Sequence, residues 1–135
     1  MARWLFKEEP ETYSFADLQR DGHTTWSGVA NALAQKHLRA AKTGDLVFFY
    51  ATGKVKAVVG VAEVTTDPAP DPADETGKNV AVTIKPLRAL AAPVTLAAIK
   101  ADPAFASWEL VKQARLSVMP VPDALWARVE SLAQG

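Results

Sequence analysis

The stretch from residue 45 to residue 66 most constrains what this chain can fold into. The apolar and aromatic run from Asp45 to Ala51 predicts a buried strand, and the valine-rich run from Val55 to Thr66 predicts a second. Thr52-Gly53-Lys54 has the composition of a turn, so the chain is expected to reverse direction there. A third strand is expected over Val80 to Leu90, where apolar residues alternate at the start. Strands that follow one another in this way favour an antiparallel sheet.

Shorter elements are expected on both sides of these strands. Arg3 to Lys7 and Leu116 to Val121 have the pattern of strands. Apolar spacing, caps and stop signals predict helices over Ser14 to Asp21, Val29 to Ala41, Thr95 to Lys100 and the stretch that begins at Pro122. Residues 67–78, with three prolines and three aspartates, predict an exposed loop. The predicted fold class is α+β, a strongly curved, mostly antiparallel sheet or barrel flanked by short helices.

Length and composition exclude several classes of protein. The 135 residues are expected to form one domain, 1–135, with a single core. The sequence has no cysteine, and its two histidines, His23 and His37, are far apart, so we expect neither a disulfide nor a metal site nor a bound cofactor. No apolar stretch approaches the ~18 residues of a membrane span. A cytoplasmic protein without a membrane partner is therefore expected.

The charges of the chain cancel, with 15 basic and 15 acidic residues, so no global positive field draws it to nucleic acid. Positive charge is concentrated locally in Lys36, His37, Arg39 and Lys42. This basic stretch is either a solvated surface or a weak contact for a nucleic-acid backbone.

The peptide Trp4-Leu5-Phe6-Lys7-Glu8-Glu9-Pro10 is the first candidate for a binding site. On an extended strand Lys7 and Glu9 lie on the same face, because side chains alternate between faces. Opposite charges beside aromatic surface suit a polar, flat ligand that forms hydrogen bonds. The alternative is an edge strand with a solvated ion pair.

The peptide Trp26-Ser27-Gly28-Val29-Ala30-Asn31 is the second candidate. Trp26 can act as a stacking plate for a ligand or pack onto the start of the following helix. The Asn31 amide can pair with the edge of a base or with nearby backbone. Both alternatives stay open at each residue.

Two later segments add polar and aromatic candidates. In Phe48-Phe49-Tyr50, alternation places Phe48 and Tyr50 on one face and Phe49 on the other, so one face can line a pocket. Arg115, which shares a strand face with Ser117, can stack on a base or grip a phosphate. The alternative for Arg115 is an ion pair with Glu9 or Asp45.

Five segments in order together resemble the EVE domain family over nearly the whole chain. They are Trp4 to Pro10, Tyr13 to Leu18, Trp26 to Asn31, Gly44 to Tyr50 and Arg115 to Val121. The resemblance implies a PUA-like fold, a small curved barrel with peripheral helices, in the broad group of PUA, ASCH and YTH domains. It also implies a reader of modified bases such as 5-methylcytosine, with modified DNA favoured over RNA as the partner. A monomer is expected.

The resemblance further implies roles for individual residues around a base extruded from its stack. Trp26 and one of Phe49 or Tyr50 would supply stacking surface. Lys7, Glu9, Asn31 and Ser117 would read polar edges. Arg115 would hold the rim of the pocket or a phosphate.

The chain differs from the family's usual pattern at Glu8, Ser27, Ala30 and Ala114. An extra carboxylate at Glu8 would repel phosphate and favour a base that presents amino donors. One alternative function is that of a small ASCH-like amidohydrolase that acts on a modified nucleoside through Lys7 and Glu9. Another is a module that binds a peptide or a methylated side chain in an aromatic pocket.

Overall fold

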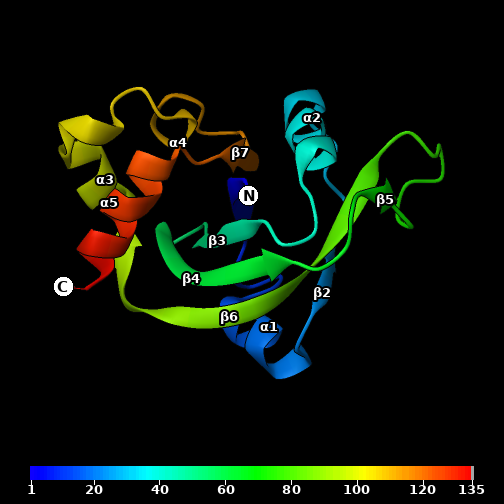
Figure 1. The fold of residues 1–135 in the computed structure, drawn as a ribbon, viewed down its shortest axis with the longest axis horizontal. Helices are drawn as coiled ribbons and strands as arrows, with labels where there is room; N and C mark the ends of the chain where they lie inside the picture. Colours follow the sequence, from blue (N-terminus) through cyan, green and yellow to red (C-terminus); the bar gives the residue numbers. More distant parts are fainter. Residues whose placement is uncertain (135) are drawn as a thin grey trace.

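The computed structural model describes residues 1–134 and shows a strongly curled sheet with short helices around it (Figure 1). The seven strands are β1 (Arg3–Glu8), β2 (Thr24–Trp26), β3 (Leu46–Ala51), β4 (Ala57–Val64), β5 (Ala69–Pro70), β6 (Val80–Thr95) and β7 (Val118–Pro120). The helices are α1 (Phe15–Asp21), α2 (Ala32–Ala40), α3 (Leu96–Ala101), α4 (Glu109–Lys112) and α5 (Asp123–Ala133), with a 3₁₀ turn, η1, at Pro103–Phe105. The predicted α+β class is confirmed.

The order of strands explains both the curl and the position of the candidate residues. The strands run β2-β6-β4-β3-β1-β7, and every pair is antiparallel except β1 with β3. β6 is 16 residues long, pairs with β2 near its start and with β4 along the rest, and carries irregularities that bend it. In the parallel pair, Lys7 of β1 lies opposite Tyr50 of β3. The carboxyl ends of these two strands therefore meet at one edge.

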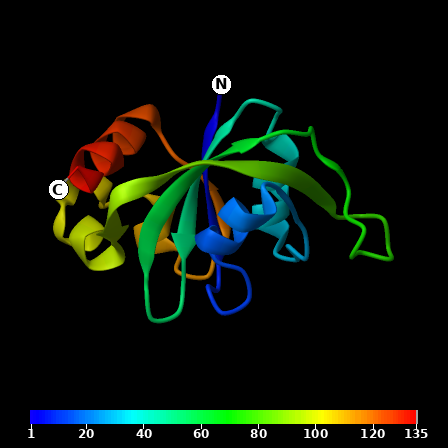
Figure 2. The same cartoon turned by 90° about the horizontal axis from the view of Figure 1, so that it is seen from below.

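Helices cover both ends of the curled sheet. Figure 2 shows α3 and α5 together at one end, with α2 and the β5 segment towards the other. Phe48 of β3 stacks on Trp126 of α5 with ring centroids 3.6 Å apart and planes 7° apart. Phe49 points the other way, edge-on to Phe15 of α1. Both faces of β3 are therefore core.

Among residues 1–134 no helix is both long and apolar enough to cross a membrane.

Local signals placed most helix ends correctly. Ser14 caps α1 in a reciprocal capping box with Asp17, and Thr95 caps α3 through the backbone N–H of Ala98. Four short elements, β2, β5, η1 and α4, were missed by the sequence reasoning. The helix expected from Val29 begins instead at Ala32, because Gly28 has φ +75° and residues 27–31 form an extended loop.

Candidate functional site

Lys7 is held at the edge where β1 and β3 end. Its Nζ donates to the carbonyl oxygen of Ala114 at 3.0 Å and lies 5.6 Å from the centroid of the Tyr50 ring. Its backbone N–H donates to the carbonyl oxygen of Ser117 at 2.9 Å. Half-burial of the side chain lowers the pKa of Lys7 below that of an ordinary lysine. The ammonium therefore has a fixed place and only a partial shell of water.

Lys7 and Glu9 do not pair, because β1 ends at Glu8 and Glu9 lies just beyond the strand. The Glu9 carboxylate lies under the β3–β4 turn, where its Oε2 accepts a hydrogen bond from Thr52 Oγ1 at 3.1 Å. Within residues 1–134 no ion pair joins Glu9 to Lys7 or to Arg115. The solvated pair considered from the sequence is thus absent.

Glu8 points to the opposite face of β1, into a small cavity of about 210 Å³. We name this cavity the Trp26 pocket. It is lined by Glu8, Thr12, Tyr13, Thr24, Thr25, Trp26 and Ser27. Glu8 Oε1 accepts a hydrogen bond from the backbone N–H of Glu9 at 2.8 Å, which fixes the carboxylate at the mouth of this cavity. The pocket combines an acceptor, several hydroxyls and two aromatic rings.

Trp26 forms the inner wall of the Trp26 pocket and is also part of the core. Its ring lies 5.4 Å from Phe6 and 5.5 Å from Phe49, edge-on to the latter, and only 6% of the residue is exposed. Phe49 is 0% exposed, which leaves Tyr50 as the member of that pair with surface on a cavity. Trp26 therefore packs into the sheet.

Tyr13 supplies the second aromatic ring of the Trp26 pocket. Its hydroxyl donates to Asp21 Oδ2 at 2.9 Å, and burial followed by this hydrogen bond raises the pKa of Tyr13. The sequence reasoning did not select Tyr13, although it lies in one of the five family segments. The separation of Tyr13 and Trp26 in the sequence does not predict that they line one pocket, because this depends on how the chain returns from α1 to β2.

Two buried polar side chains hold the loop of residues 27–31 beside this pocket. Asp71 accepts hydrogen bonds from the backbone N–H groups of Gly28 and Ala73, each at 2.8 Å. Gln35 Nε2 donates to the carbonyl oxygen of Val29 at 2.7 Å, and its Oε1 accepts from the N–H of Val80. Asp71 is only 3% exposed, so the expectation of an exposed loop over residues 67–78 is wrong at this position. The residue is buried because it satisfies orphan backbone donors.

We expect Asp71→Ala to loosen this loop. The change leaves two backbone N–H groups without their acceptor and should lower the free energy of unfolding by roughly 1–3 kcal/mol. Urea denaturation measures this, and Glu75→Ala, at an exposed position of the same segment, is the control. Equal midpoints for the two variants would contradict the role given to Asp71.

Asn31 and Arg115 face a second, shallower cavity of about 490 Å³, which we name the Arg115 hollow. Asn31 caps α2, because its Oδ1 accepts from the N–H of Ala34 at 2.9 Å, so the alternative of pairing with local backbone is confirmed. No residue from 1 to 134 accepts a hydrogen bond from the Asn31 Nδ2. The ion pair considered between Arg115 and Asp45 is also absent within the described residues, where Asp45 binds the N–H groups of Ala2, Trp4 and Lys42 instead. The Arg115 guanidinium is therefore left at the surface.

The structure divides the predicted residues among neighbouring hollows rather than one pocket. Trp26 lies in the Trp26 pocket, Asn31 and Arg115 in the Arg115 hollow, and Lys7 with Tyr50 in a third cavity of about 280 Å³. Ser117 contributes its carbonyl oxygen to Lys7. Over the described part of the chain, no group of three His, Cys, Asp or Glu side chains is placed to hold a metal ion.

Solved structures of similar proteins cover this whole chain. A protein from Rhodopseudomonas palustris is 40% identical with a TM-score of 0.94, and the match covers 99% of this chain and 94% of that one. Human thymocyte nuclear protein 1, solved in complex with DNA containing 5-methylcytosine, is 25% identical with a TM-score of 0.92, covering 100% and 99%. An ASCH protein from Zymomonas mobilis, at 15% identity and a TM-score of 0.60, shares the fold alone.

Sequence comparison agrees with these structural matches. Thymocyte nuclear protein 1 of Gallus gallus is 35% identical over 80 residues, which is 50% of this chain and 33% of that protein. The chain thus spans about a third of the length of this curated relative. The family model of the EVE domain matches residues 2–132. The chain therefore belongs to the EVE domain family.

Proposed function

We propose that this protein reads a modified cytosine in DNA by taking the base into the Trp26 pocket. The observation that carries the proposal is the pairing of the Glu8 carboxylate with two aromatic rings in one cavity. It is supported by the family member from human that was solved with DNA containing 5-methylcytosine. The N4 amino group of cytosine donates hydrogen bonds, and a glutamate carboxylate is a good acceptor for them.

The mechanism begins with extrusion of the base from the duplex, which costs a few kcal/mol of stacking and pairing. Trp26 and Tyr13 border the plane of the base, and base stacking on aromatic rings returns ~1–3 kcal/mol. The Glu8 carboxylate accepts the N4 amino hydrogen, while the Ser27 and Thr24 hydroxyls are available for the remaining polar edge. Arg115 and the Asn31 amide hold the sugar-phosphate rim beside the pocket.

Replacement of Glu8 by serine tests this assignment. We expect Glu8→Ser to weaken binding of a duplex with one 5-methylcytosine by about 10- to 100-fold, because hydrogen bonds to charged groups contribute roughly 1.5–3 kcal/mol. Fluorescence anisotropy with labelled duplexes that differ only in cytosine, 5-methylcytosine or 5-hydroxymethylcytosine provides the measurement. Glu11→Ser, at an exposed position nearby, is the matched control.

Two results would overturn the proposal. One is equal affinity of the unmodified protein for all these duplexes. The other is an unchanged affinity and base preference after Glu8→Ser.

Hydrolysis of an acylated cytidine is the second candidate, and one observation favours it. The lowered pKa of Lys7 makes its amine easier to deprotonate, as a general base requires. The Glu9 carboxylate is bound to Thr52, so the pair would have to rearrange to act together. Release of acetate from N4-acetylcytidine that is lost in Lys7→Met would support hydrolysis, and stable binding without product would remove it.

A further inference from the structure

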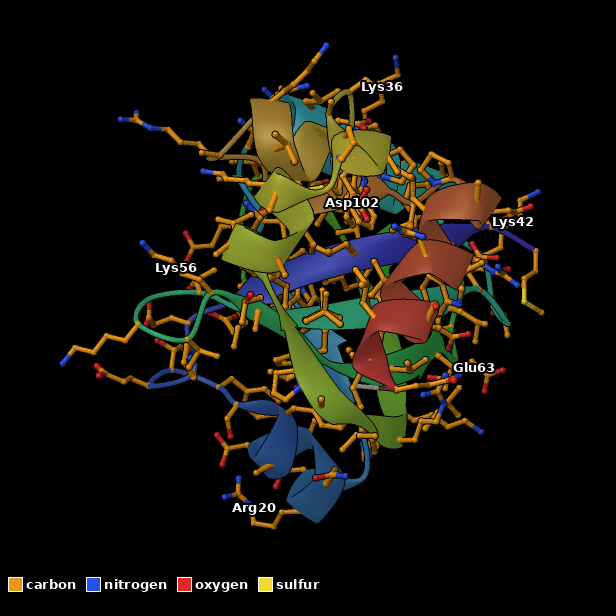
Figure 3. All side chains as sticks on the ribbon, turned by 90° about the vertical axis from the view of Figure 1, so that its left-hand side faces the viewer. Arg20, Lys36, Lys42, Lys56, Glu63 and Asp102 are labelled. Atoms are coloured by element: carbon orange, nitrogen blue, oxygen red, sulfur yellow. The ribbon has the colours of Figure 1, made fainter. Side chains whose placement is uncertain are left out.

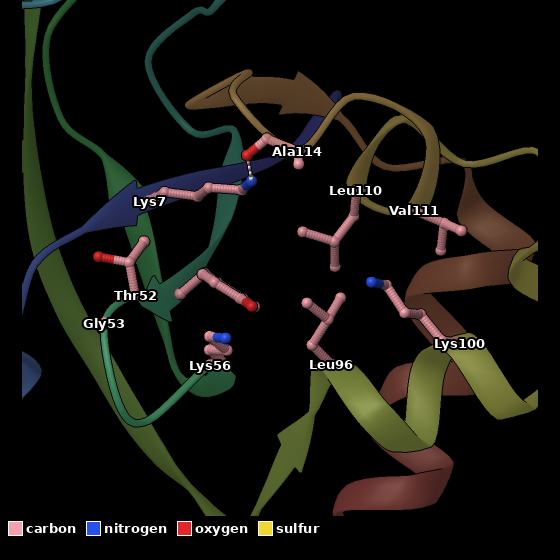
Figure 4. A pocket seen from close by; sticks show the side chains of 10 residues that line it. Lys7, Thr52, Gly53, Lys56, Leu96, Lys100, Leu110, Val111 and Ala114 are labelled. Atoms are coloured by element: carbon pink, nitrogen blue, oxygen red, sulfur yellow. Dashed lines mark hydrogen bonds between the residues drawn. The ribbon is translucent and has the colours of Figure 1, made fainter.

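Four lysines line a continuous groove on the other side of the β1 end from the Trp26 pocket. Two cavities of about 280 and 420 Å³ share Lys56, Leu96 and Lys100 as walls. Lys7 lies at one end of the groove and Lys54 at the other. Figure 4 shows Lys7 running along β1 to the carbonyl oxygen of Ala114, and Lys100 pointing into the first cavity from α3. We name this feature the lysine groove.

The lysine groove gathers four positive charges on a protein whose charges cancel overall. No aspartate or glutamate from residues 1–134 lines either cavity. None of the four lysines belongs to an ion pair within that range. Ammonium groups gathered without carboxylates favour an anionic ligand.

Lys56 has an unusual backbone conformation. Its φ of +48° makes it the one residue other than glycine with a positive φ over the described range. This conformation costs a non-glycine residue roughly 1–2 kcal/mol. The Lys56 carbonyl oxygen accepts a hydrogen bond from the N–H of Leu96 at 2.8 Å, which joins the β3–β4 turn to the start of α3. This hydrogen bond holds Lys56 against the start of α3, where both residues line the groove.

The β3–β4 turn is also fixed on the side that faces Glu9. Gly53 has φ +67°, and a Cβ there would lie 2.4 Å from Glu9 Oε1. The close approach lets the Glu9 carboxylate bind Thr52 beneath the turn. Glu9 thus supports the groove from the strand side and is not one of the residues that line it.

We infer that the lysine groove binds the phosphodiester backbone of the DNA whose base occupies the Trp26 pocket; this inference rests on the proposed function. The groove and the Arg115 hollow share Ala114, whose carbonyl oxygen holds Lys7. Arg115, Lys7, Lys56 and Lys100 therefore follow one path around the end of β1. Contacts of this kind fix the position of the duplex without reading its sequence.

The basic stretch of α2 is a less suitable track for the backbone. Arg39 already donates to the carbonyl oxygen of Lys78 at 2.8 Å, and His37 packs 6.1 Å from Trp4. In Figure 3, Lys36 and Lys42 lie well apart from each other and from Lys56. Lys36→Gln/Lys42→Gln therefore removes as much charge as a groove variant but from a different surface.

The salt dependence of DNA binding tests the inference. The probes are two duplexes of one sequence, with cytosine or 5-methylcytosine at one position, measured between low and physiological salt. We expect Lys56→Gln/Lys100→Gln to weaken both duplexes by a similar factor, about tenfold or more, and to leave their affinity ratio unchanged. The slope of log affinity against log salt should become less steep by about 1 for each lysine that contacts a phosphate. Lys36→Gln/Lys42→Gln should change the slope less.

The possible failures can be told apart. A preference for 5-methylcytosine with an unchanged salt slope in the groove variant would overturn the inference alone. A reduced slope without preference for either duplex would support the groove and overturn the base-reading function. Absence of binding to either duplex at low salt would overturn both.

Discussion

Replacing Asp45 by alanine is expected to lower the free energy of unfolding by about 3–5 kcal/mol, since each buried donor left unpaired costs roughly 1–3 kcal/mol. Asp45 is 4% exposed and is the common acceptor for three N–H groups. Its Oδ2 binds Trp4 Nε1 at 2.9 Å and the backbone of Lys42 at 2.9 Å, while Oδ1 binds the backbone of Ala2 at 3.0 Å. The carboxylate therefore ties the start of β1 to the turn before β3.

Urea denaturation of Asp45→Ala measures this effect. Asp67→Ala is a suitable control, because Asp67 also accepts hydrogen bonds, from Thr43, but at an exposed position. A loss below about 1 kcal/mol for Asp45→Ala, within the range of an ordinary hydrogen bond, would contradict its role as the anchor of the parallel strand pair.

Replacing Trp26 by alanine should affect both stability and ligand binding. Deletion of a buried tryptophan costs about 3–5 kcal/mol, and here it removes contacts with Phe6 and Phe49. The same change removes the inner wall of the Trp26 pocket, so the preference for a modified base should disappear. Loss of binding in Trp26→Ala therefore does not by itself distinguish a missing pocket wall from an unfolded protein.

Trp126→Ala separates the two effects. Trp126 of α5 is 3% exposed and stacks on Phe48, and it lines neither the Trp26 pocket, the Arg115 hollow nor the lysine groove. It should lose similar stability, about 3–5 kcal/mol, yet keep its preference for 5-methylcytosine at a temperature where circular dichroism shows it folded. If both variants lose the preference while folded, or neither does, Trp26 has no specific part in recognition.

The sequence predicted the core of this architecture well, because its signals are local. The apolar pattern of Arg3 to Lys7 placed β1, and the turn composition at Thr52-Gly53-Lys54 placed the β3–β4 hairpin. β2 was missed because three residues, Thr24 to Trp26, are too few to show a period. α2 was started too early because Val29 continues the apolar spacing, while the positive φ at Gly28 has no signal in that spacing.

The candidate site was harder to predict because it depends on which segments meet. Alternation gave the relative faces of Phe48 and Phe49, but not that helices cover both faces of β3 and bury both rings. The burial of Asp71 depends on a contact with Gly28, 43 residues away. Lys56 and Lys100 come together only because the β3–β4 turn binds the start of α3, and isolated lysines in a sequence carry no sign of such a meeting.

The most direct test of base reading is a pair of backbone amide NMR maps, recorded with two duplexes that differ only in one cytosine or 5-methylcytosine. The difference between the maps isolates the effect of the modified base from that of the phosphates. We predict differences concentrated at Glu8, Tyr13, Trp26 and Ser27, with shifts at Lys56 and Lys100 common to both duplexes. Identical maps, or differences confined to residues away from the Trp26 pocket, would contradict the account.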